Sequence, residues 1–215
     1  IGTATLWPEP VLKRSALATF KLIKLPAKMT NRFEILPTPL KDLFIVERKP
    51  IGDSRGWFER FFCQDEWQAC GLQKPIVQMN RTQTQAKGSV RGMHFQHNPH
   101  LETKIVTCIK GEVFDIAIDL RPQSATYLKW YGTTLSAQNH RSFYIPDGFA
   151  HGFQTLTDDC ELLYLHTERF APQCADGLNP LDPALAIEWP LPFAELSEND
   201  KNRPMLSPSF KGLSV

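Results

Sequence analysis

The sequence predicts an all-β protein, an antiparallel sandwich or barrel with only short peripheral helices. From residue 33 onward, short strand-like runs follow one another between turns, and almost no stretch has the apolar spacing of an amphipathic helix. The clearest run is residues 112–120, in which alternate side chains fall into two sets. One face is predicted to carry Val113, Asp115, Ala117 and Asp119, and the other Phe114, Ile116, Ile118 and Leu120.

Strand signals continue along the chain, and turns separate them. In order, the predicted strands are residues 43–47, 76–80, 104–109, 112–120, 130–135, 142–145, 152–156 and 161–167. Residues 50–53 are predicted to form a turn, and Lys110-Gly111 is predicted to be the turn of a hairpin. Residues 66–70 fit one short helix that ends at Gly71. Farther on, a long helix is excluded by the prolines Pro180, Pro183, Pro190 and Pro192.

The length of 215 residues suits a single domain with a sizeable core. We interpret residues 1–28 as an N-terminal extension that carries no visible chemistry, because Met29-Thr30 would make a plausible start. The extension lacks the compact apolar core and small-residue cleavage site of a signal peptide. Residues 29–215 are predicted to form one domain, since no repeat or linker divides them.

The net charge indicates which partners the protein can attract, and the cysteine content indicates the cellular compartment. The formal net charge is +1 and charged residues make up 22% of the chain, so no broad field favours nucleic acid or a membrane surface. No apolar run approaches the roughly 20 residues that span a bilayer. The five cysteines are odd in number and lack CxxC spacing, which indicates reduced thiols and a cytoplasmic protein.

Two histidines lie in strand-forming segments beside glycines: His94 in residues 91–96, and His151 in residues 144–153. Each could be a metal ligand, a proton-transfer base or a buried structural residue. The spacings Gly88-(five residues)-His94 and Pro146-x-Gly148-x-x-His151 are typical of the cupin class of small β-barrels.

A metal-binding cupin needs two histidines at alternate positions of the first motif, so that both imidazoles face inward. The second position here is Gln96, and a neutral amide is a poor ligand for such metals. The Asn98-Pro99 turn separates the nearby His97 and His100. We therefore predict no metal site and favour metal-free chemistry in which histidine transfers a proton.

Further motifs occur in one order and at near-constant spacing from about residue 40 to 205. They are residues 52–58, 77–80, 91–96, 111–115, 135–139, 145–153, 163–164, 182–183, 187–190 and 196–200, together with Lys104. This set resembles the dTDP-4-dehydrorhamnose 3,5-epimerase family. The resemblance implies a cupin-type jelly roll, usually a homodimer, that uses no cofactor. It also implies a substrate in which a 4-keto-6-deoxyhexose is linked to a nucleoside diphosphate.

The same resemblance assigns roles to the reacting groups. A 4-keto group makes the hydrogens at C3 and C5 acidic, so a base can remove one and an acid on the opposite face can return it. His94 would be the base, oriented by Asp200, and Tyr164 would be the acid. Lys104 would stabilise the enolate charge, and His151 would lie near the same oxygen or the sugar.

For the rest of the substrate, the resemblance places Arg55 and Arg91 on the diphosphate, since guanidinium groups offer forked donors. Gln78 and Asn80 would lie near the base or sugar. Phe170, where tyrosine is commoner, would stack on thymine. The expected binding set is completed by Phe58, in the motif of residues 52–58, and by Arg60.

The sequence departs from the family at several recognition positions. The usual glutamate after the Arg-Gly motif falls at Arg60, with Glu59 displaced by one residue, which on a strand would reverse its face. A second usual acidic position is Ala175, and the usual Gln-x-Lys is Glu102-Thr103-Lys104. These changes leave the sugar, and the choice of C3, C5 or both, open. A metal-dependent cupin enzyme and a non-catalytic sugar-nucleotide-binding cupin are the alternatives.

Overall fold

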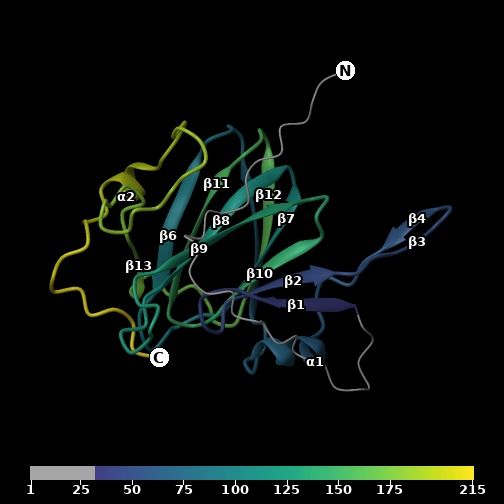
Figure 1. Cartoon of the computed structure of the whole chain (residues 1–215), viewed down its shortest axis with the longest axis horizontal. Coiled ribbons are helices and arrows are strands. Elements are labelled where there is room, and N and C mark those ends of the chain that lie inside the picture. Colours follow the sequence, from purple (N-terminus) through teal and green to yellow (C-terminus); the bar gives the residue numbers. More distant parts are fainter. Residues whose placement is uncertain (1–31) are drawn as a thin grey trace.

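The computed structural model describes residues 32–215 as two antiparallel sheets stacked face to face, with a small hairpin projecting from the body (Figure 1). The predicted extension, residues 1–28, lies outside the described residues. The larger sheet contains, in spatial order, β1 (Phe33–Pro37), β2 (Phe44–Arg48), β10 (Arg141–Ile145), β7 (Lys104–Lys110), β12 (Cys160–His166) and β5 (Gln78–Thr84). The smaller contains β13 (Ala175–Gly177), β6 (Val90–Gln96), β11 (Phe149–Thr155), β8 (Glu112–Asp119) and β9 (Trp130–Ser136). The predicted all-β sandwich is confirmed.

Apolar side chains fill three layers. The central layer joins both sheets, with Val106 and Leu162 from the larger and Val113 and Phe153 from the smaller. A second layer lies on the outer face of the smaller sheet, where the C-terminal part of the chain covers Ile116 and its neighbours. The faces predicted for residues 112–120 are thus confirmed, because Val113 and Ala117 point between the sheets while Ile116, Ile118 and Leu120 point outward.

The third layer covers the outer face of the larger sheet. There Trp67 and Leu72 pack on Ile105 and Tyr144. Trp67 ends α1 (Gln64–Trp67), which continues into the 3-10 turn η1 (Gln68–Cys70). Gly71 ends this turn in the left-handed conformation, with φ 88°, and its N–H donates to the carbonyl of Gln68. The predicted short helix is confirmed, and it begins two residues earlier than expected.

The hairpin predicted at Lys110-Gly111 is wrong. β7 and β8 belong to different sheets, so the chain crosses from one layer to the other at this point. Gly111 has φ +76°, and an added Cβ would lie 2.7 Å from Thr157 Oγ1 and 2.8 Å from Cys160 Sγ. Alternation identifies the two strands, but both are buried on both faces, so the pattern does not show which sheet each joins.

The turn predicted at residues 50–53 is also wrong. These residues form β3 (Ile51–Asp53), which pairs with β4 (Gly56–Phe58), and the turn falls at Ser54 and Arg55. Asp53 closes the turn by accepting hydrogen bonds from the Arg55 backbone and guanidinium. This β3–β4 hairpin projects from the sandwich (Figure 1), and Trp57 and Phe58 are 62% and 66% exposed.

The crossover at Gly111 gives a stability prediction. Gly111→Ala should lower the free energy of unfolding by about 1–3 kcal/mol, because alanine resists positive φ and its Cβ meets two neighbours. The control is Gly52→Ala, whose Cβ would make only an ordinary contact of 3.5 Å. Urea unfolding of both variants measures the difference. Equal stabilities would show that Gly111 does not constrain the crossover.

Candidate active site

A cavity of about 960 Å³ opens between the two sheets and is bordered by the C-terminal segment 193–201. The larger sheet contributes side chains from β5, β7 and β12, and the smaller sheet from β6 and β11. All four residues predicted to be catalytic line this cavity: His94, Lys104, Tyr164 and Asp200. Of the residues predicted to bind substrate, the cavity lining includes Asn80, Arg91 and His151.

His94 and Asp200 form a hydrogen-bonded pair, with His94 Nε2 2.7 Å from Asp200 Oδ1. Asp200 lies in α2 (Glu198–Lys201), where its backbone N–H is capped by Ser197 Oγ. Burial raises the pKa of Asp200, but the His94 contact and its neighbours outweigh burial and lower the pKa below its usual value. An ionised carboxylate only accepts hydrogen bonds, so Nε2 of His94 carries the proton. Nδ1 of a neutral His94 is then the free proton acceptor.

A second histidine–carboxylate pair lies directly across the sheet. His151 is opposite His94 in the register of β11 and β6, and its Nε2 is 2.8 Å from Asp115 Oδ1. Asp115 is fully buried, and burial raises the pKa of its carboxyl group. Its other oxygen, Oδ2, meets no hydrogen-bond donor within residues 32–215. Asp115 was not predicted as a site residue, although it was assigned to the strand face of Val113 and Ala117, which lies between the sheets.

Tyr164 lies between two imidazole rings. Its ring centroid is 6.0 Å from that of His151, edge to face, and 6.0 Å from that of His166, stacked at 17°. Burial raises the pKa of Tyr164 well above its usual value. The phenol therefore stays protonated at neutral pH, as a proton donor must.

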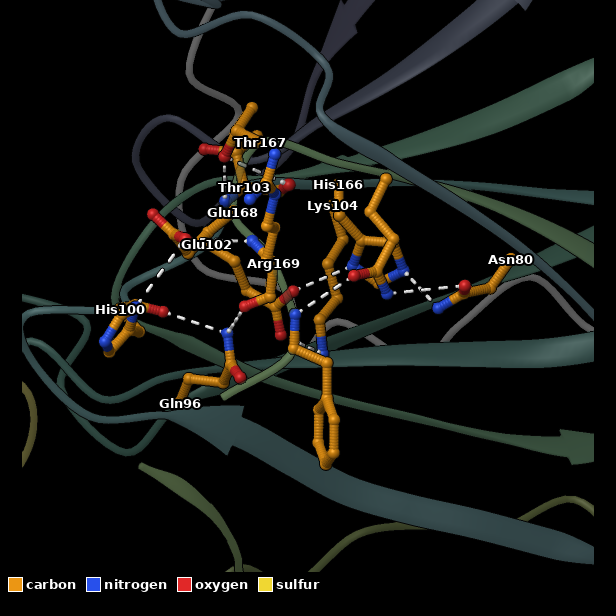
Figure 2. Close-up of polar contacts among 12 residues, drawn as sticks. Asn80, Gln96, His100, Glu102, Thr103, Lys104, His166, Thr167, Glu168 and Arg169 are labelled. Carbon is orange, nitrogen blue, oxygen red and sulfur yellow. Dashed lines mark hydrogen bonds and ion pairs between the residues drawn. The ribbon is translucent and has the colours of Figure 1, made fainter. Parts of the chain in front are cut away.

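Lys104 is held by a carboxylate that it shares with a third histidine (Figure 2). Lys104 Nζ lies 3.0 Å from Glu102 Oε1, and His166 Nδ1 lies 2.7 Å from Glu102 Oε2. Burial raises the pKa of Glu102, but Lys104 and His166 outweigh burial and lower it to about 2. His166 is absent from the sequence prediction. The signal was available, because His166 is two residues from Tyr164 and so shares its face of the strand.

Several predicted binding residues lie outside this cavity. Arg55 and Phe58 are on the projecting β3–β4 hairpin, where the Arg55 side chain is 88% exposed and pairs with Asp53. Phe170 is exposed, and its backbone N–H donates to Gln78 Oε1 at 3.0 Å. Gln78 begins the edge strand β5. These four residues therefore do not meet His94 within one copy of the chain.

Arg60 also lies away from the cavity. Its guanidinium donates to Glu66 of α1 at 2.7 Å, while Glu59 is buried against Arg48 and His140. The face-reversal argument for Glu59 was wrong, because β4 ends at Phe58 and residues 59 and 60 follow the strand. Both side chains anchor the base of the β3–β4 hairpin to the body.

The Gln96 side chain makes hydrogen bonds to backbone groups of two neighbouring loops. Its Nε2 donates to the carbonyls of His100 and Arg169, and its Oε1 accepts from Ala171 N–H at 2.6 Å. His97 pairs with Asp176, and His100 lies 3.6 Å from Glu168. Within residues 32–215, no group of three His, Cys, Asp or Glu side chains is arranged to hold a metal ion.

Fold and site together define a class of protein: a jelly-roll enzyme that abstracts and returns protons on a substrate bound between its sheets. The groups that can do so are two histidine–carboxylate pairs, a protonated phenol and a lysine. His94, His151, Lys104 and Tyr164 come from strands of both sheets and line one cavity, and Asp200 reaches it from α2.

Comparison with known proteins agrees with this class. The family model described as dTDP-4-dehydrorhamnose 3,5-epimerase matches residues 37–208. The enzyme of that name from Shigella flexneri is 40% identical over 169 residues, which cover 78% of this chain and 93% of the relative. A dTDP-4-dehydrorhamnose 3-epimerase from Streptomyces niveus is 35% identical over 172 residues, 80% of this chain and 83% of the relative.

Among solved structures, the RmlC epimerase from Legionella pneumophila, in complex with dTDP-4-keto-L-rhamnose, superimposes with a TM-score of 0.80 and 36% identity. The match covers 85% of this chain and 98% of that one. The chain belongs to the dTDP-4-dehydrorhamnose 3,5-epimerase family, and it is a sugar-nucleotide epimerase with the predicted cupin-type jelly-roll fold.

The His94–Asp200 pair gives a prediction for the site. Asp200→Asn should lower turnover by about 100-fold or more, because an amide can donate to Nε2 and place the proton on Nδ1, which removes the base. Proton exchange into a keto-sugar substrate measures the effect. The control is Asp176→Asn, which changes a carboxylate paired with His97 outside the cavity. Unchanged exchange in Asp200→Asn would rule out this role for Asp200.

Proposed function

We propose that this chain epimerises dTDP-4-dehydro-6-deoxyglucose at C3 and C5 to give dTDP-4-dehydrorhamnose, without a cofactor, in deoxysugar and cell-surface polysaccharide biosynthesis. The observation that carries the proposal is the placement of base and acid on opposite sheets. His94 extends from β6 of the smaller sheet, and Tyr164 from β12 of the larger, into the same cavity. Inversion at a carbon requires removal and return of the proton from opposite faces, and a sugar between the sheets meets both groups.

The steps follow from the protonation states. Nδ1 of His94 takes the hydrogen from the carbon beside the ketone, and the electron pair moves onto the C4 oxygen. The buried carboxylate of Asp200 stabilises the imidazolium that forms. Lys104 stabilises the charge on the enolate oxygen. Tyr164 then gives its proton to the other face of the carbon, and the ketone re-forms.

Recognition residues are proposed on both sides of the cavity mouth. Arg91 lines the cavity, and its Nε donates to Thr84 Oγ1 at 3.0 Å. We propose that this contact orients the guanidinium group toward the diphosphate. Asn80 lies on β5 beside Tyr164 in register. Gln78 and Phe170, joined by a hydrogen bond, are proposed to hold the sugar or base and to stack on thymine.

We also propose a homodimer in which the β3–β4 hairpin of each copy covers the cavity mouth of the other. The hairpin carries Arg55 and Phe58 of the family motif yet lies away from its own cavity. Ile51 and Phe58 are opposite each other in register and exposed, and Trp57 is exposed on the other face of the hairpin, so a second copy would bury apolar side chains here. Arg60 and Glu66 fix the base of this hairpin.

Cytoplasmic location is a further proposal. All five cysteines lie within the described residues and are free thiols, as expected in a reducing compartment. Within residues 32–215, no helix combines the length and apolar character needed to cross a bilayer.

Deuterium exchange tests the reaction. In heavy water, the wild-type chain should exchange hydrogen at C3 and C5 of dTDP-4-dehydro-6-deoxyglucose, as followed by NMR. His94→Ala should abolish exchange because it lacks the base. Tyr164→Phe should permit some abstraction but impair inversion, because the return of the proton is lost. Wild-type rates in His94→Ala would refute the assignment of the base.

Two results in the wild-type chain would favour the other functions. Binding of dTDP without exchange in any 4-keto-6-deoxyhexose would favour a non-catalytic binding protein. Stoichiometric iron, manganese or zinc, with activity lost on chelation, would favour a metal-dependent cupin. Exchange at C3 alone would make the chain a 3-epimerase.

The hairpin gives a separate prediction. Light scattering should give twice the mass of the chain, and Trp57→Ser combined with Phe58→Ser should give monomers with turnover reduced about tenfold or more. The matched control is Met205→Ser combined with Val215→Ser, which changes exposed apolar residues outside the hairpin and outside the cavity lining. A hairpin variant that stays dimeric and fully active would exclude this interface.

A further inference from the structure

We propose that His166 and Glu102 are positioning residues that hold the ammonium of Lys104 in the cavity, and that they connect it with the residues that bind the nucleotide. This inference rests on the proposed function, because it concerns the roles of Lys104, Asn80, Gln78 and Phe170 there. His166 lies outside the family motifs, and Glu102 replaces the family's usual glutamine. The proposal gives both residues a role in the site.

The sheet brings these side chains together. β12 lies between β5 and β7, and His166 is opposite Gln78 on one side and Lys104 on the other. Residues directly opposite one another share a face, so the three side chains form a row across the inner surface. Asn80 is two residues from Gln78 and shares its face. Figure 2 shows the central part of this arrangement, with His166 between Asn80 and Lys104.

One backbone N–H fixes the direction of the hydrogen bonds. Phe170 N–H can only donate, so it fixes the carbonyl end of Gln78 at 3.0 Å. Gln78 Nε2 then donates to Asn80 Oδ1 at 3.3 Å. The amide nitrogen of Asn80 is left to face His166 Nε2 at 3.3 Å, so Nε2 is the acceptor. The proton of neutral His166 is therefore on Nδ1, which donates to Glu102 at 2.7 Å.

Glu102 is suited to this place because a carboxylate has two acceptor oxygens and no donor. It accepts from His166 with Oε2 and from Lys104 with Oε1. Glutamine has only one acceptor end, so it would turn an N–H toward one of these two donors. The lowered pKa of Glu102, about 2, agrees with a carboxylate that stays ionised. The Nδ1–H of His166 therefore requires an acceptor at position 102, which glutamate supplies and glutamine bound to Lys104 does not.

The competing interpretation is that His166 only packs against Tyr164, on whose ring it is stacked. Two substitutions separate packing on Tyr164 from hydrogen bonding to Glu102, because each keeps one of these and removes the other. His166→Phe keeps a flat ring over Tyr164 but loses both hydrogen bonds. His166→Asn loses the ring, but its Nδ2 occupies the place of Nδ1 and can still donate to Glu102.

Steady-state kinetics with dTDP-4-dehydro-6-deoxyglucose should show that the two His166 variants differ in kcat but share a raised KM. His166→Phe should lower kcat by about tenfold or more, because Glu102 no longer fixes Lys104. His166→Asn should keep kcat within about threefold of wild type, since the link to Glu102 remains. Both should raise KM by about three- to tenfold, because both lose the link to Asn80. His97→Asn, which alters a histidine–carboxylate pair outside the cavity, should change neither constant.

Glu102→Gln alone supplies a second measurement, which does not depend on the folding of either His166 variant. It should lower kcat by about tenfold or more, because one donor faces an N–H. Adding His166→Phe removes the Nδ1–H donor, so the glutamine N–H no longer faces it. The double variant should then lose no more than the worse single variant, which is a strong departure from additivity.

The outcomes distinguish this inference from the proposed function. Absence of exchange in the wild-type chain would refute the proposed function, whatever the variants do. An active wild type with high kcat in His166→Phe and low kcat in His166→Asn would reduce His166 to packing and overturn the inference. Additive losses in the double variant would likewise show that His166 and Glu102 act independently.

Discussion

Carboxylates buried beside the cavity determine how its other charged and titratable groups are held. A carboxylate taken out of water is costly unless cations or hydrogen-bond donors compensate it. Asp200, Asp115 and Glu102 each meet a histidine within 2.8 Å, and Glu102 also meets Lys104. Removal of one partner would leave a carboxylate oxygen without its hydrogen-bond donor, so the groups proposed to perform the chemistry also satisfy the buried carboxylates.

The three histidines differ in which ring nitrogen contacts a carboxylate and in whether the other nitrogen is also hydrogen-bonded. His94 contacts the ionised Asp200 through Nε2, which leaves Nδ1 as the acceptor of a neutral ring, whereas His151 contacts Asp115, the pKa of which is raised by burial. His166 contacts Glu102 through Nδ1, and its Nε2 is occupied by Asn80. A base needs one unoccupied nitrogen facing the substrate, and a positioning residue needs both nitrogens engaged. His94, whose side chain is 45% exposed toward the cavity, fits the first description, and His166 fits the second.

Sequence alone predicted the strands from β7 to β12 and the division of residues 112–120 into two faces, because side-chain alternation is a local property of each strand. It did not predict that β7 and β8 belong to different sheets, since pairing depends on contacts distant in the chain. The catalytic set followed from the motif resemblance, and the structure brings its four members to one cavity. Asp115, Glu102 and His166 were harder to assign. Their roles arise from cross-strand neighbours, and a single charged residue in a strand pattern does not reveal its partner.

The departures from the family motifs have different structural consequences. Arg60 and Glu59 lie outside the cavity of their own chain and anchor the projecting hairpin through Glu66 and Arg48. Glu102, in contrast, lies behind Lys104, close to the place where the enolate charge would develop. A substitution that adds a buried negative charge next to an enolate would oppose the reaction unless another donor shared that charge. His166 provides such a donor, so the chain can replace glutamine by glutamate and still present Lys104 to the substrate. We therefore expect the choice of sugar to depend on Asn80 and His166, which line the cavity, more than on Arg60, which does not.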